Sequence, residues 1–101
     1  MNVSTLANAP KVPSGLDAYK MYLSPALDVM HLHLVPGEQV PVHTNPLDVV
    51  FCVIQGNVML EANGTSIMLN TYDVIEILGG VERGLKNDSD QDLRVLVLKK
   101  H

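Results

Sequence analysis

The chain has 101 residues, which is enough for one domain with a single core. Apolar residues make up 47% of it and charged residues 18%, with no charge block and no low-complexity run, so the composition excludes a disordered chain. The net charge is −4 and the seven Lys and Arg residues are scattered, which argues against nucleic acid as a partner because no basic stripe could neutralise phosphates.

Residues 1–10 carry no basic region and no apolar run of signal-peptide length, and no transmembrane-length apolar run occurs later. We therefore expect no membrane partner. Cys52 is the only cysteine, so an intramolecular disulfide and a thiolate-rich metal cluster are both excluded. The compartment expected for such a chain is reducing and cytoplasmic.

Residues 1–15 contain Pro10 and Pro13 and are predicted to form a loose N-terminal arm ahead of one domain over residues 16–101. An arm of this kind could add a strand to the sheet of a neighbour.

From residue 17 onward, short runs rich in Val, Ile, Leu and Met alternate with Pro, Gly, Asn and Asp every eight to twelve residues, which predicts an all-β domain. One hairpin is expected around residues 24–26. A second is expected at Asn63-Gly64, because a type I′ turn needs positive φ at both central residues.

Six apolar residues follow one another from Val49 to Ile54, so both faces of that strand should be covered. The core would cover one face, and a second layer or a second subunit the other, which favours a homodimer. An all-β chain of this length hides its strand edges in a closed barrel or a double-sheet jelly roll, and we expect the jelly roll.

Two groups of turn residues have a specific spacing. The first comprises Pro36-Gly37, His43 after five intervening residues, and Gly56 at the end of the apolar strand, and the second comprises Asp73, Gly80 and Asn87. Together they resemble the two motifs of the small single-domain cupins, over roughly residues 18–98. The resemblance implies a jelly-roll barrel with its site inside.

In metal-binding cupins these motifs supply four ligands, and the corresponding positions here hold His43, Asn45, Val49 and Arg83. A transition metal needs three or four N, O or S donors from the protein. Val49 has no donor atom, and Arg83 brings a permanent positive charge. The motif is degenerate, and we expect no metal or other cofactor.

By the same resemblance, the barrel lining should be apolar, with His43, Asn45, Arg83 and Glu76 pointing into it. Glu76 interrupts an apolar strand, and a buried carboxylate needs a partner, for which Arg83 is the natural candidate. A purely structural interpretation is that Glu76 and Arg83 form an ion pair in place of the metal. The predicted apolar lining is Met30, Leu32, Val49, Phe51, Val53, Val95 and Val97.

The function expected from these residues is metal-free binding of a small polar or anionic ligand by His43, Asn45, Glu76, Arg83, Met30 and Phe51. Arg83 would hold an anionic group through its planar fork of donors. The alternative is a small enzyme, such as an isomerase, a lyase or a dioxygenase-like cupin with a weak metal site at His43, in which His43 or Glu76 moves a proton. An interaction protein with a purely structural barrel is a third possibility. His31 and His33 are expected to face outward.

Overall fold

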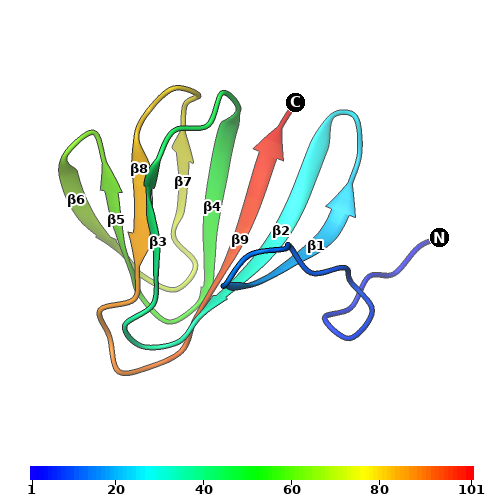
Figure 1. Ribbon diagram of the computed structural model, residues 1–101, viewed down its shortest axis with the longest axis horizontal. Coiled ribbons are helices and arrows are strands. Elements are labelled where there is room, and N and C mark those ends of the chain that lie inside the picture. The colour runs from blue at the N-terminus through cyan, green and yellow to red at the C-terminus, as the bar shows by residue number, and fades with distance from the viewer.

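The computed structural model describes residues 1–101 and consists of strands and connecting turns, without a helix (Figure 1). No segment forms a helix that could span a membrane. The strands are β1 (Asp17–Leu23), β2 (Leu27–Leu34), β3 (Gln39–His43), β4 (Asp48–Gln55), β5 (Val58–Ala62), β6 (Thr65–Leu69), β7 (Val74–Ile77), β8 (Arg83–Lys86) and β9 (Leu93–Lys100). The all-β prediction is confirmed.

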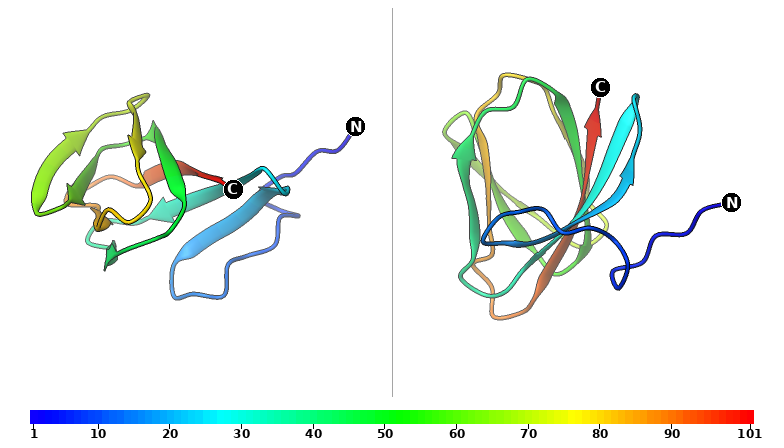
Figure 2. Two further views of the ribbon diagram at one scale, coloured as in Figure 1. Left: turned by 90° about the horizontal axis from the view of Figure 1, so that it is seen from above. Right: turned by 45° about the vertical axis from the view of Figure 1, so that its right-hand side comes forward.

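The strands form two antiparallel sheets, one ordered β1-β2-β9-β4-β7 and the other β3-β8-β5-β6. Strands that are distant in sequence are neighbours in each sheet, as the pairing of β2 with β9 illustrates. Viewed from above, the two sheets enclose a common interior (Figure 2, left). This is the double-sheet jelly roll that the sequence predicts.

Both predicted hairpins are present. The Ser24 hydroxyl accepts a hydrogen bond from the Leu27 amide at 2.9 Å and joins β1 to β2. Asn63 and Gly64 connect β5 to β6 with φ values of 50° and 78°, the positive values that a type I′ turn requires. These local sequences fix the register of both strand pairs.

Gly56 ends the first motif at a place where no other residue fits. Its φ is 81°, and a Cβ added there would lie 2.6 Å from the carbonyl oxygen of Asp92. A side chain at this position would therefore clash with backbone and adopt an unfavourable conformation. The close approach joins the end of β4 to the loop before β9.

The end of the N-terminal arm pairs with strand β1 of its own chain. The Val12 amide donates to the carbonyl of Ala18 at 2.8 Å, and the Lys20 amide donates to the carbonyl of Pro10 at 2.7 Å. Lys11 adds an ion pair to Asp17 at 3.0 Å. The chain before this short pairing runs away from the barrel (Figure 2, right).

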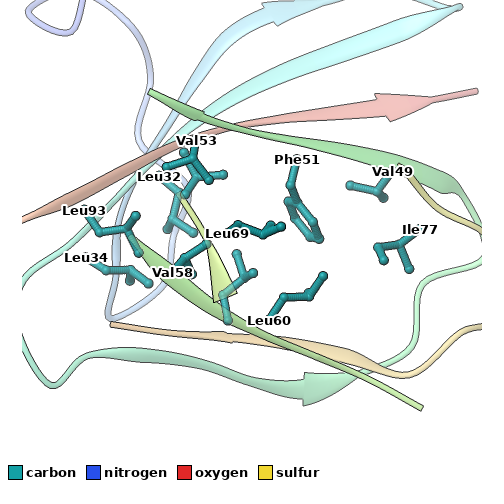
Figure 3. Close-up of a cluster of buried hydrophobic side chains, with 12 residues drawn as sticks. Leu32, Leu34, Val49, Phe51, Val53, Val58, Leu60, Leu69, Ile77 and Leu93 are labelled. Atoms are coloured by element: carbon teal, nitrogen blue, oxygen red, sulfur yellow. The ribbon is translucent and has the colours of Figure 1, made fainter. Parts of the chain in front are cut away.

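The core fills the space between the sheets, with Leu34 and Leu93 at one end and Val49 and Ile77 at the other (Figure 3). It comprises Leu32, Leu34, Val49, Phe51, Val53, Val58, Leu60, Leu69, Ile77, Leu85, Leu93 and Val95. On the outer face of β4, Val50, Cys52 and Ile54 are only half-buried and no second layer of this chain covers them. A homodimer through this face stays a prediction.

Candidate functional site

The barrel interior is hollow at the end where β9 finishes and β8 begins. A cavity of about 200 Å³ lies there, between the two sheets and beside the N-terminal arm. Its apolar walls are formed by Val12, Leu16, Ala18, Met30, Leu32, Val40, Val49, Phe51, Leu85 and Val97. The remaining lining residues are Ser14, His43, Asn45, Arg83, Gly84 and Lys99, so no carboxylate lines the cavity.

Arg83 is the largest fully buried side chain of the protein, with 2% of its surface exposed. It begins β8, where it pairs with His43 of β3. Its Nη1 donates to the carbonyl of Val81 at 2.9 Å, whereas its buried Nη2 has no hydrogen-bond partner. Burial lowers the pKa of the guanidinium, but a guanidinium stays protonated in proteins. Arg83 therefore holds a buried positive charge without a counter-ion.

His43 and Asn45 lie on the same wall of the cavity, and each already uses one polar atom. The Nδ1 of His43 lies 2.9 Å from the carbonyl oxygen of Pro41, which can only accept, so Nδ1 carries the proton. In the neutral ring Nε2 is then an acceptor. The Oδ1 of Asn45 accepts from the amide of Leu47 at 2.9 Å, which leaves the Asn45 NH₂ group as a donor.

These residues do not fit the transition metal that many cupins hold. Of the four ligand positions, Val49 is a buried hydrocarbon, Arg83 is a cation, and the Asn45 oxygen is already bonded to the Leu47 amide. Nowhere in the chain does a group of three or more His, Cys, Asp or Glu side chains form a possible metal site. A single imidazole at His43 cannot supply the three or four donors that such an ion needs.

The prediction that Glu76 points into the barrel is wrong. Glu76 pairs with Val50 in the sheet, whereas Ile77 pairs with Val49 and joins the core. Successive residues of a strand face opposite sides, so Glu76 lies on the outer surface. There its carboxylate pairs with Lys100, and the predicted ion pair with Arg83 does not form.

The structure brings together five of the six predicted ligand-binding residues: Met30, His43, Asn45, Phe51 and Arg83 line the same cavity. Lys99 also lines it and was missed. Its signal was present in the sequence, because Val95, Val97 and Lys99 alternate along β9 and so share a face. No sequence pattern predicts that Val12 and Ser14 line the cavity, because their position depends on how the N-terminal arm folds back onto the barrel.

His31 and His33 lie outside the cavity, on the outer side of the five-stranded sheet. His33 is held between two carboxylates, with Nδ1 2.9 Å from Asp17 and Nε2 3.1 Å from Asp92. The hydrogen bond to Asp17 is the main cause that raises the pKa of His33, and it also holds the pKa of Asp17 well below its usual range. Burial lowers the pKa of His31, whose ring contacts Tyr19 edge-on.

The cupin domain family model matches residues 30–99, which include most of the cavity wall and both motifs. The chain therefore belongs to the cupin family, as its spacing of turn residues and its two-sheet barrel indicate. No curated protein sequence matches it significantly.

Solved structures with the same fold have dissimilar sequences. An RmlC-like cupin from Shewanella frigidimarina superposes with a TM-score of 0.86 at 15% identity, over 99% of this chain and 90% of the other. The Cnp3 cupin domain of Schizosaccharomyces pombe has a TM-score of 0.84 at 17% identity, over 95% and 71%. KdgF from Halomonas sp. has a TM-score of 0.83 at 15% identity, over 100% and 94%. At these identities the similarity concerns the fold alone.

Proposed function

We propose that this cupin binds a small anion inside its barrel, through Arg83 and without a metal ion. Arg83 occupies a position that supplies a metal ligand in other cupins, and its guanidinium replaces the cation as the electrostatic centre of the cavity. Guanidinium groups bind carboxylates and phosphates through paired, charge-assisted hydrogen bonds, which suits a small anionic ligand.

The observation that carries this proposal is the buried, unpaired charge of Arg83. Removing a charge from water costs several kcal/mol unless a partner compensates, and a single carbonyl bond at Nη1 compensates only part of it. No Asp or Glu lines the cavity, and Nη2 has no partner in the protein. An anion from solution would satisfy both the charge and the unused donor.

The test is a thermal-shift screen of the purified chain against small carboxylates, sugar acids, phosphate and sulfate. A ligand at a hundred times its dissociation constant should add about 2.7 kcal/mol to the free energy of unfolding. Arg83→Met should abolish the stabilisation by the same anions. The matched control is Arg94→Met, because Arg94 pairs with His33 in the sheet and so lies on the outer face, away from the cavity.

Stabilisation that is equal in the wild type and in Arg83→Met would overturn the proposal, and so would a screen in which no anion stabilises the protein. Metal analysis of protein purified without added metal is a separate test. Near-stoichiometric Mn, Fe, Ni or Zn would contradict the metal-free assignment.

A second candidate function is proton transfer by His43. The bond from Nδ1 to Pro41 fixes the tautomer in which Nε2 is the free base, as a general base requires. An enzyme of this kind would lose turnover in His43→Gln while still binding the anion through Arg83. The anion screen supplies the compounds on which that turnover is sought.

A further inference from the structure

Lys99 adds a second positive charge to the cavity from the sheet that faces Arg83. It is the last inward residue of β9, after Val95 and Val97, and it pairs with Val49 and with Asp28. Asp28 bonds instead to His101, at 3.0 Å, and the Lys99 ammonium forms no ion pair within the chain. Residues with cationic side chains thus line the cavity from both sheets.

The side chains around the cavity offer more hydrogen-bond donors than acceptors to a ligand. Arg83 and Lys99 offer donors only, and the Asn45 NH₂ group adds further donors, while Asn45 Oδ1 already accepts from the Leu47 amide. With Nδ1 bonded to Pro41, the neutral form of the His43 ring offers an acceptor at Nε2, whereas the Ser14 hydroxyl is already bonded to the backbone of Leu16. A ligand that satisfies this set carries several acceptor oxygens and one hydroxyl or amide hydrogen.

The rest of the cavity is apolar and small. Met30, Phe51 and Val97 form a wall without polar side-chain atoms other than a thioether sulfur. The volume of about 200 Å³ is somewhat larger than the roughly 150 Å³ engineered cavity that accepts benzene. Inorganic phosphate would leave the apolar wall uncovered, whereas a short hydrocarbon chain would cover it.

From these features we infer that the ligand is a short-chain hydroxy carboxylate. Its carboxylate lies between Arg83 and Lys99, its hydroxyl donates to Nε2 of His43, and its aliphatic part packs against Met30 and Phe51. This inference rests on the proposed anion binding and adds the chemical class of the anion. Lys99 thereby acts as a specificity-determining residue that the cupin motifs do not contain.

The experiment compares three probes of one shape by titration followed with ¹H–¹⁵N correlation spectra of the intact chain. The probes are 2-hydroxy-4-methylpentanoate, 4-methylpentanoate without the hydroxyl, and neutral 4-methylpentanamide. The hydroxy acid should bind at least about fivefold more tightly than the simple acid, since it adds one hydrogen bond, and the amide should bind weakest. Cross-peaks of residues in the cavity should move.

Lys99→Gln should weaken binding of the hydroxy acid about tenfold, because a charge-assisted bond is lost. Lys100→Gln is the matched control, since the neighbouring Lys100 faces outward and pairs with Glu76, and its affinity should stay unchanged. In His43→Phe the advantage of the hydroxy acid over the simple acid should disappear. Urea midpoints establish that each variant remains folded.

The outcomes separate the two proposals. Carboxylate binding that needs Arg83 but is unaffected by Lys99→Gln, or that shows no preference for the hydroxy acid, overturns this inference and leaves anion binding intact. If none of the three probes binds while phosphate or sulfate stabilises the chain through Arg83, the inference also fails. If no anion binds in the cavity at all, both proposals fall.

Discussion

Along β9 the inward-facing residues change from Leu93 and Val95 at one end of the barrel to Val97 and Lys99 at the other. Leu93 and Val95 are completely buried, whereas Val97 and Lys99 are half-buried and line the cavity. The same strand therefore contributes to a filled end and to a hollow end. We refer to these as the closed end and the open end of the barrel.

The two ends also differ in the hydrogen bonding of their buried polar side chains. At the closed end Asn87 is fully buried, and all the polar atoms of its amide group are hydrogen-bonded. At the open end Arg83 is equally buried but keeps Nη2 unpaired. The contrast indicates that the closed end stabilises the fold, whereas the unpaired group at the open end lowers stability in favour of a binding site.

The difference in packing between the two ends can be tested by replacing valine with alanine at one position of β9 in each end. Val95→Ala should lower the free energy of unfolding by about 3 kcal/mol, because it removes fully buried methyl groups and leaves a void. Val97→Ala should cost less than about 1 kcal/mol, because its side chain already borders open space. Urea denaturation of both variants measures the difference, and equal losses would show that the two ends do not differ in packing.

Asn87→Ala tests whether the closed end depends on its polar connections. The Asn87 Nδ2 donates to the carbonyls of Leu34 and Gln91, at 2.9 and 2.8 Å, and its Oδ1 accepts from the Ser89 amide and hydroxyl. Removing the amide leaves carbonyls unsatisfied in a buried place, with an expected loss of about 2 kcal/mol. Ser89→Ala is the control and should cost much less, as the hydroxyl is nearer the surface. A similar loss in both variants would assign the effect to the loop alone.

At the open end we expect a substitution that stabilises the chain instead of destabilising it. Arg83→Met should raise the stability of the unliganded chain by about 1 kcal/mol, because a buried charge without a counter-ion is replaced by an apolar side chain of similar length. The measurement is the urea midpoint in a buffer without carboxylate, phosphate or sulfate. Destabilisation under these conditions would mean that the bond to Val81 contributes more than the burial of the charge costs.

The sequence predicts the strands and most residues of the cavity, but it does not predict the orientation of Glu76 or the missing counter-ion of Arg83. Alternation and turn residues such as Asn63-Gly64 predict the strands, and the motif spacing places His43, Asn45 and Arg83 in one cavity. The orientation of Glu76 was predicted wrongly because its neighbours in residues 74–78 are apolar on both faces of the strand, so only the long-range pairing of Val50 with Glu76 decides which face is inside. The absent counter-ion of Arg83 likewise depends on three-dimensional neighbours.

The smallest predicted effect concerns the outer surface at the closed end, where His33 joins β2 to Asp17 and Asp92. The groups around it are these two carboxylates, Lys11 on Asp17, Arg94 on the adjacent strand and the His31 ring. The pKa of His33 is raised in the folded chain, mainly by Asp17, so the folded state binds more protons than the unfolded state. Its contribution is therefore complete below the unfolded pKa of about 6.5 and is lost as pH rises through the folded pKa.

Exposed ion pairs contribute roughly 0.2–1 kcal/mol, and both carboxylates are partly exposed, so we expect about 0.5 kcal/mol for His33. The difference in unfolding free energy between the wild type and His33→Gln should be largest below the unfolded pKa of about 6.5 and should decrease as the pH rises above it. Lys100→Gln at the open end serves as the control, since the hydrogen bond to Glu76 raises the pKa of Lys100 above its ordinary value and no histidine takes part in this ion pair. A wild-type advantage that grows with pH would require His33 to be neutral in the fold, and the two carboxylates would then add nothing to the closed end.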